Sequence, residues 1–274
     1  MFDAVAEAYD VHRSGYPREI IKTAVEHASL RPGARVVEVG SGTGKLTEEL
    51  VAWRLRVDAV EPGSNMVEVA RRRLRRSDLV QFHLSRFEDI SLPAGVFEAV
   101  FSGSAFHWVD PTVGWKRAAA LLRPGGTLAL VQPIGVREEG DGTALDEMVE
   151  ALARLAPEIA SEHQVLRDLG TIEAGVEARR ENISEVWAWL AHPGMAVPEA
   201  GQLFGPATLT TVRRVKEQSA EELWAMFETT SRYHRLTPQA RVALKAEDTR
   251  IIESVGGTLR STQLVALVTA STPS

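Results

Sequence analysis

Between Arg35 and Gln132 the sequence alternates short apolar runs with longer amphipathic ones, a pattern typical of βαβ units around a parallel sheet. "LRPG" and "LRPGG" precede the first and the last of these apolar runs, and such Pro and Gly breaks end a helix before a strand. The pattern predicts an α/β fold. The expected strands are Arg35–Val39, Val57–Val60, Val80–Leu84, Ala99–Ser102 and Thr127–Val131, and the expected helices are Lys45–Trp53, Ser64–Arg75 and Thr112–Leu121.

After Gln132 the alternation stops, and residues 133–205 are expected to form an irregular helical insertion after the fifth strand, acting as a lid. "ATLTTVRRV" and "QLVALVTA" then predict two late strands, separated by the helical stretches "SAEELWAMFETTSRY" and "TPQARVALKAEDTRIIESVGG". Because more than a hairpin turn joins these strands, we expect an antiparallel pair that completes the sheet. We therefore expect one domain, 1–274, in which 1–132 form the core, 133–205 the insertion and 206–274 the last strands and helices.

Composition limits the class of protein. Of the 274 residues 44% are hydrophobic and 25% charged, and no apolar run approaches the roughly 20 residues of a membrane span. Cysteine is absent, which excludes disulfides, thiolate zinc sites and cysteine nucleophiles. The start, "MFDAVAEAYD", lacks the basic flank and apolar centre of a secretory signal. We expect a soluble, cytoplasmic protein without a membrane partner.

The formal net charge of -6 argues against nucleic-acid binding, although the run "ARRRLRR" at residues 70–76 is strongly basic. Because apolar residues accompany this run at helical spacing, we expect it to be the solvated face of a helix. No spacing of His and carboxylate residues indicates a metal site, and no G-x-S-x-G elbow indicates a hydrolase.

The stretch "VVEVGSGTGKLTEEL", residues 36–50, is expected to be a strand, a glycine turn and the start of a helix. A phosphate-binding P-loop needs G-x-x-x-x-G-K-S/T, and placing Gly44 and Lys45 in that pattern puts Val39 at the first glycine. A dinucleotide fingerprint needs G-x-G-x-x-G, and its third glycine falls on Lys45. Neither phosphate-binding pattern therefore fits the turn.

Two carboxylates flank this turn. Glu38 comes at the end of the first strand, where it would repel a pyrophosphate but hold an α-amino group or a sulfonium. Glu61 ends the next strand about 20 residues on, where a carboxylate can accept hydrogen bonds from both hydroxyls of a ribose. The turn is therefore expected to bind a ligand that has a ribose and a positive charge but no phosphate at the turn.

The segments "VVEVGSGTGKLT", "VDAVEPGSNMVEVA", "AFHWVD" and "LLRPGGTLALV" follow one another at a characteristic spacing. As a set they resemble the class I S-adenosylmethionine-dependent methyltransferases, most of all the small-molecule enzymes of the UbiE and trans-aconitate methyltransferase type, over about residues 1–132. The resemblance implies a Rossmann-like, mostly parallel seven-stranded sheet with helices on both faces and an antiparallel last strand. It also implies that the core binds S-adenosyl-L-methionine.

The resemblance further assigns cofactor contacts to residues of this chain. The backbone around Gly40, Ser41 and Gly42 would hold the methionine part, near Glu38, and Glu61 would take the ribose. Adenine would lie against Met66 and the stretch at residues 86–88, although this stretch departs from the acid and small residue common in the family. The complete expected set is Tyr9, Arg13, Glu38, Gly40, Ser41, Gly42, Glu61, Met66, Arg86, Phe87, Glu88, Ser102 and Gly103.

Methyl transfer from a sulfonium is an in-line displacement on an activated donor, so positioning and exclusion of water can supply most of the acceleration. For a phenol, alcohol or amine acceptor His107 is the expected general base, and a histidine held by a neighbouring loop is the alternative; a carboxylate acceptor needs no base. We expect an enzyme acting on a small molecule. An NAD-linked oxidoreductase and a non-methylating binding protein of the same fold remain alternatives, and the sequence leaves the oligomeric state open.

Overall fold

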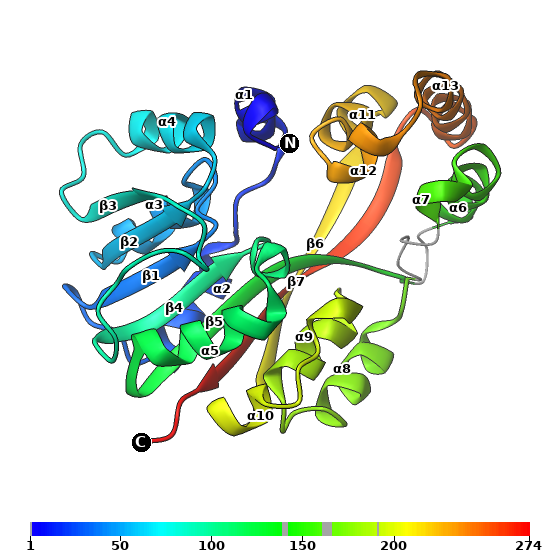
Figure 1. Ribbon diagram of the computed structural model, residues 1–274. Coiled ribbons are helices and arrows are strands. Elements are labelled where there is room, and N and C mark those ends of the chain that lie inside the picture. The colour runs from blue at the N-terminus through cyan, green and yellow to red at the C-terminus, as the bar shows by residue number, and fades with distance from the viewer. Residues whose placement is uncertain (1, 139–141, 161–165, 191) are drawn as a thin grey trace. The chain divides into compact units, whose positions relative to one another are not determined.

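In the computed structural model, which describes residues 2–138, 142–160, 166–190 and 192–274, seven strands form one sheet in the order β3-β2-β1-β4-β5-β7-β6 (Figure 1). Neighbouring strands from β3 to β5 are parallel, with Val37 of β1 opposite both Asp58 of β2 and Val100 of β4. Figure 1 shows β7 running opposite to β5. The strands are β1 Arg35–Val39, β2 Arg56–Glu61, β3 Val80–Leu84, β4 Phe97–Gly103, β5 Leu122–Val136, β6 Thr208–Gln218 and β7 Leu259–Ser271.

The described chain divides into two compact units. The larger consists of Gly15–Ile134, Gly170–Val212 and Val265–Ser274, and the smaller of Met1–Ser14, Gly135–Leu169 and Arg213–Leu264. The helical elements of the larger unit are α2 Arg18–His27, α3 Lys45–Ala52, α4 Ser64–Arg73, η2 Phe106–Trp108, α5 Pro111–Leu121, α8 Leu169–Glu177, α9 Ile183–Leu190, η3 Pro193–Met195 and α10 Ala200–Leu203. Those of the smaller are η1 Phe2–Val5, α1 Ala6–His12, α6 Ala144–Leu155, α7 Pro157–Ala160, α11 Ala220–Phe227, α12 Ser231–Arg235 and α13 Pro238–Ser254.

In the larger unit both faces of the sheet are buried. Alternate strand residues point to opposite faces, and helices cover each face. On one face Val36, Ala59 and Phe101 pack with residues of α2 and α3. The intervening strand residues, such as Val37 and Val100, are also fully buried, and α5 contacts β4. Figure 1 shows α2 behind the sheet and α5 in front of it. The predicted α/β fold with helices on both faces is confirmed.

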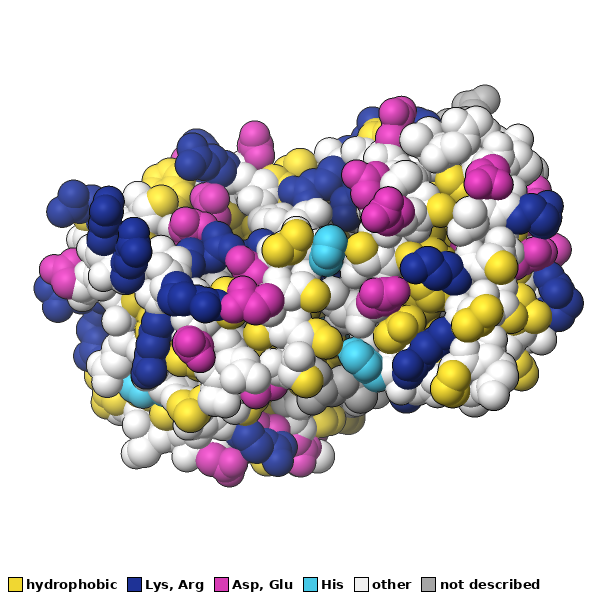
Figure 2. Space-filling model, turned by 90° about the horizontal axis from the view of Figure 1, so that it is seen from above, with side chains coloured by type: hydrophobic (Ala, Val, Ile, Leu, Met, Phe, Trp, Pro, Cys, Tyr) yellow, Lys and Arg dark blue, Asp and Glu magenta, His cyan; other side chains and the backbone are white. Residues whose placement is uncertain are grey.

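The basic run lies on α4 and just beyond its end. Met66, Val67 and Val69 bury one side of this helix, whereas Arg71, Arg72, Arg75 and Arg76 are exposed. Lys and Arg side chains gather over this region at the left end of Figure 2. The run is therefore an exposed basic patch beside a buried apolar stripe.

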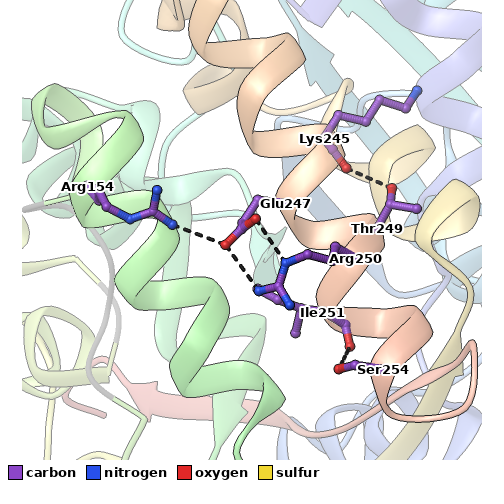
Figure 3. Close-up of polar contacts among 7 residues, drawn as sticks. All are labelled: Arg154, Lys245, Glu247, Thr249, Arg250, Ile251 and Ser254. Carbon is purple, nitrogen blue, oxygen red and sulfur yellow. Dashed lines mark hydrogen bonds and ion pairs between the residues drawn. The ribbon is translucent and has the colours of Figure 1, made fainter.

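In the smaller unit α6 packs along α13. Glu247 of α13 accepts hydrogen bonds from Arg250, one turn on, and from Arg154 of α6 at 3.1 Å (Figure 3). Beneath these exposed groups Trp224 donates its indole N–H to Asp248 at 3.1 Å, and both side chains are buried. This unit therefore has a core of its own, with a buried carboxyl group inside it.

Two features of the fold depart most from the expected element bounds. Strand β5 begins at Leu122 and ends at Val136, well beyond the predicted Thr127–Val131 on both sides. The stretch expected as one helix over 219–233 forms α11 and α12, because Thr230 ends the first through a bond to Phe227 O and caps the second. Among the described residues, no helix combines the length and apolarity needed to cross a membrane.

Candidate functional site

The glycine turn between β1 and α3 has a backbone that other residues rarely adopt. Gly40, Gly42 and Gly44 have φ values of 69°, 53° and 82°, in the left-handed region that favours glycine. A Cβ on Gly40 would also collide with the side chain of Ala105, which follows β4. The turn therefore lies directly against the segment after β4, with no room for a side chain at position 40.

Backbone and side-chain hydrogen bonds join the turn to the end of β2. The carbonyl oxygen of Val60 accepts from the amides of Gly40 at 2.9 Å and Ser41 at 3.1 Å. The carboxylate of Glu61 accepts from the amide of Gly42 at 3.0 Å, and its side chain is only 9% exposed. The structure thus brings the predicted glycine residues and Glu61 together at one end of the parallel strands.

Buried polar atoms gather around this turn without hydrogen-bond partners among the described residues. They are Oγ of Ser41 and the hydroxyl oxygen of Thr43. Oε2 of Glu38 and the hydroxyl oxygen of Thr47 are buried there too, with only each other as a possible partner. Such atoms are uncommon in folded proteins, because each one loses the hydrogen bonds it made to water. Their gathering at one turn fits a site that a polar ligand completes. The two threonines were not predicted from the sequence, although Thr43 lies within the glycine turn and Thr47 in the first turn of α3.

Glu38 is 1% exposed. Burial raises the pKa of its carboxyl group to about 8; a hydrogen bond with the Thr47 hydroxyl opposes this rise, and the negative charge of Glu61 adds to it. A positively charged group bound beside Glu38 would favour the ionised carboxylate. The pair of acids therefore favours a cationic ligand over an anionic one.

Ser102 and Gly103 end β4 beside the turn. The Ser102 hydroxyl donates to the carbonyl oxygen of Val39 at 2.8 Å, which ties the end of β4 to the end of β1. A Cβ on Gly103 would overlap the phenol of Tyr16, whose hydroxyl lies 3.4 Å from Oγ of Ser104. Ser104 itself has a φ of 54°, which is uncommon for a residue other than glycine and is typical of functional segments.

The residues expected near adenine lie on α4 and after β3. Met66 is buried on α4. Phe87 is also buried, with its ring 6.5 Å from that of Phe106. Arg86 donates to Glu88 at 2.9 Å and has an exposed side chain, while Glu88 also accepts from the amide of residue 110. The side chains at 86–88 thus make contacts within the protein, and their contact with adenine stays a prediction.

Tyr9 and Arg13 belong to the smaller unit. Nε of Arg13 donates to the hydroxyl of Thr229 at 2.8 Å, and the guanidinium lies over the ring of Tyr9, 5.4 Å from its centroid. Thr229 is itself buried and donates to Met226 O. These contacts hold Arg13 in place within its own unit, and its role toward a cofactor stays a prediction.

His107 lies in η2, directly after the segment that touches the glycine turn. Its imidazole stacks on that of His192, with ring centroids 3.8 Å apart and planes 7° from parallel. Burial lowers the pKa of His107 to about 3, and the neighbouring His192 lowers it further; burial lowers the pKa of His192 to about 4. His192 was not predicted from the sequence, because 84 residues lie between it and His107 and no local pattern joins them.

These residues of the larger unit make a site at the carboxyl ends of β1, β2 and β4, where open α/β sheets bind ligands. Its two acids and its buried hydroxyls suit a polar, cationic molecule with hydroxyl groups. In the described part of the chain, no group of three or more His, Asp or Glu side chains could hold a metal ion.

Comparison with known proteins relates the region that contains this site to a protein family. The family model described as a methyltransferase domain matches residues 37–130. The uncharacterized methyltransferase Rv3342 of Mycobacterium tuberculosis is 38% identical over 130 residues, which are 47% of this chain and 51% of that protein. The matched stretch thus spans about half the length of that relative. A demethylmenaquinone methyltransferase of Clavibacter sepedonicus is 28% identical over 73% of this chain and 82% of its own length.

Solved structures share the fold across nearly the whole chain. A candidate type II methyltransferase from Anaeromyxobacter dehalogenans is similar with a TM-score of 0.59 and 19% identity, covering 96% of this chain and 99% of that one. At this identity the likeness concerns the arrangement of helices and strands. The match extends beyond residues 37–130 to the insertion and the last strands.

Proposed function

We propose that this chain, whose residues 37–130 are a class I methyltransferase domain, transfers a methyl group from S-adenosyl-L-methionine to a small-molecule acceptor. The observation that carries the proposal is the group of unpartnered buried polar atoms between two acids, at a glycine turn that fits neither phosphate-binding pattern. The cofactor supplies a methyl group that is activated by a sulfonium. The protein's own residues have to bind the cofactor, orient the acceptor and exclude water.

Each predicted site residue has a role in this proposal. Glu38 faces the amino group, the backbone of Gly40–Gly42 receives the methionine part, and Glu61 binds the ribose hydroxyls. Ser102 and Gly103 border the reacting methyl group. Met66 and residues 86–88 receive adenine; a contact of Tyr9 and Arg13, which belong to the smaller unit, with the methionine carboxylate stays a prediction.

His107 has a part in the acceptor site of the proposed enzyme. Its low pKa makes the imidazole neutral at pH 7 but a weak base, because a general base is most effective with a pKa near the working pH. The low pKa therefore supports a hydrogen bond from His107 to the acceptor more strongly than transfer of the acceptor's proton to His107. In the displacement the nucleophile's electron pair would form the bond to the methyl carbon while the carbon–sulfur bond breaks and its electron pair passes to sulfur, so that S-adenosylhomocysteine leaves; any acceptor proton would pass to His107 or to solvent.

The insertion, residues 133–205, selects the acceptor in this proposal through its residues 170–205, which belong to the larger unit; residues 139–141, 161–165 and 191 lie outside the described part of the chain. Apolar and aromatic side chains such as Trp187, which is fully buried in the larger unit, support this role. A small acceptor is also supported by the net charge of -6, which disfavours nucleic acid. The absence of cysteine supports a cytoplasmic location.

Calorimetry with S-adenosylhomocysteine tests the proposal. We expect binding at one site per chain and an increase in melting temperature, because a ligand that binds only the native state stabilises it. NAD in the same assay should have no effect. Stabilisation by NAD with no response to S-adenosylhomocysteine would instead favour an oxidoreductase.

A further inference from the structure

The two stacked histidines come from distant parts of the chain, and one side chain holds both segments. Trp115 of α5 packs against Phe106 of η2, with ring centroids 4.7 Å apart, and its Nε1 donates to the carbonyl oxygen of Met195 at 3.1 Å. Phe106 directly precedes His107, and Met195 is three residues after His192. All five residues belong to the larger unit. The stack is therefore fixed by the core beneath it.

The stacked rings and their neighbour Trp187 contain buried nitrogen atoms that packing does not need. Nδ1 of His107, Nε2 of His192 and Nε1 of the adjacent Trp187 are buried without hydrogen-bond partners among the described residues. The ring of Trp187 lies 5.6 Å from that of His192, so the three rings form one cluster. An unsatisfied buried polar group costs about 1–3 kcal/mol, and apolar rings would fill the same space without that cost. Packing alone does not account for two histidines here.

Charge on this cluster is disfavoured. Burial opposes protonation of both imidazoles, and two parallel rings 3.8 Å apart cannot both be cations without strong repulsion. Among the described residues, His192 is the titratable group whose charge acts on the pKa of His107. A carboxylate brought to this cluster would lose its hydration without gaining a cationic partner.

A neutral imidazole has one N–H donor and one bare nitrogen acceptor. A hydroxyl group also both donates and accepts, so it can bond to either tautomer of either ring. A carboxylate can only accept, and an ammonium group can only donate. The chemistry of the pair therefore matches an uncharged hydroxyl.

We propose that the stacked imidazoles of His107 and His192 bind an uncharged hydroxyl group of the methyl acceptor, an alcohol or a phenol, with His192 as a positioning residue for His107. This inference rests on the proposed function and narrows its acceptor class. His192 stands in the insertion, so it would connect that segment to the residue after β4 that faces the acceptor.

Two-dimensional NMR of the histidine Cε1–H groups tests this proposal without requiring methyl transfer. Phenol is the uncharged probe and benzoate the anionic one, each titrated at pH 7 into the full chain with and without S-adenosylhomocysteine. We expect phenol to shift the His107 and His192 signals and benzoate to leave them unchanged. Equal or larger shifts with benzoate, or no response to phenol, would overturn the proposal.

Variants separate a positioning role from simple packing. His192→Ala should raise the pKa of His107 toward 6.5 and weaken phenol binding by up to about ten-fold, the effect of one lost hydrogen bond. His192→Phe keeps the stacked ring and should leave the pKa of His107 low while still weakening phenol. His27→Ala, at an exposed position on α2, is the matched control and should change neither quantity.

The results also distinguish this inference from the function on which it rests. If S-adenosylhomocysteine binds but phenol shifts neither histidine, the hydroxyl site is wrong and the methyltransferase proposal stands. If S-adenosylhomocysteine fails to bind, the methyltransferase proposal is refuted regardless of phenol. If the His192→Phe variant binds phenol with the affinity of the unchanged protein, His192 is only a packing residue.

Discussion

One carboxylate oxygen of Glu61 accepts the amide of Gly42 at 3.0 Å, and the other accepts the amide of Gly63 at 2.9 Å. The acid at the end of β2 thereby fixes the glycine turn after β1 and the turn that begins α4. The same carboxylate is the proposed ribose partner. Glu61 would thus shape the site and bind the ligand with one side chain.

Replacing Glu61 should therefore weaken cofactor binding. We expect Glu61→Ala to reduce the affinity for S-adenosylhomocysteine by on the order of 1 to 3 kcal/mol, because a charged hydrogen-bonding group is lost. Isothermal titration calorimetry measures the change. Glu68→Ala, an exposed acid on α4, is the control and should bind normally. Unchanged affinity in the Glu61 variant would remove it from the ribose site.

Cofactor binding should release a proton from Glu38. At pH 7 its carboxyl group is mostly protonated, since burial raises its pKa to about 8, and a cationic ligand favours the ionised form. Calorimetry in two buffers of different ionisation enthalpy should show release of up to about one proton per site. Glu38→Gln should abolish the release. The same release in both proteins would mean that another group titrates.

Asp248 should make the protein less stable as the pH rises. Burial raises its pKa from 3.8 to about 7, so the unfolded state loses this proton first and stability falls between these two pH values. Asp248→Asn should therefore be the more stable protein at pH 8, by on the order of 1 to 4 kcal/mol, with the difference vanishing near pH 4. Urea denaturation followed by circular dichroism measures both. The Asn side chain can still accept from Trp224.

The neighbouring Glu247 provides a control of opposite sign. Its hydrogen bonds to Arg250 hold the pKa of this carboxyl group below the usual value. Any stability that it contributes is present above its unfolded pKa and is lost as the pH falls through the folded one. Glu247→Gln should therefore match the unchanged protein at low pH and be no more stable at pH 8. If both Asp248→Asn and Glu247→Gln raise the free energy of unfolding at pH 8, the cause is the loss of a negative charge in general and not the burial of Asp248.

Gly40→Ala should destabilise the turn through two separate effects. The positive φ costs an alanine about 1 kcal/mol, and its methyl group would collide with Ala105. Adding Ala105→Gly should restore part of the lost melting temperature, because it relieves the collision and leaves the backbone strain. No recovery in the double variant would show that the collision contributes little.

The sequence predicted the fold well because its signals are local. β1 and β3 begin and end where expected, the former directly before the glycine turn, and the resemblance to class I methyltransferases is confirmed. The break after α11 was missed because helical spacing continues through 228–230, while the hydroxyls of Thr229 and Thr230 end the helix by bonding its last carbonyls.

The site was predictable where its residues lie in the turn or directly at a strand end, as Glu61 does. Glycines at left-handed positions and an acid two residues before them are visible in the order of residues. The contact of His107 with His192 and the burial of Asp248 arise from tertiary packing, which no periodicity encodes. The raised pKa of Glu38 likewise depends on how completely the surrounding strands exclude water.

The tyrosine that leaves no room at Gly103 has an implication for how this sequence can diverge. No positive φ constrains residue 103, so what limits a side chain there is the Tyr16 phenol, which would have to move to admit one. Positions 16 and 103 should consequently change together among homologues, a bulkier residue at one requiring a smaller residue at the other. Such paired substitutions would alter the wall of the site at residue 103, which is proposed to border the transferred methyl group.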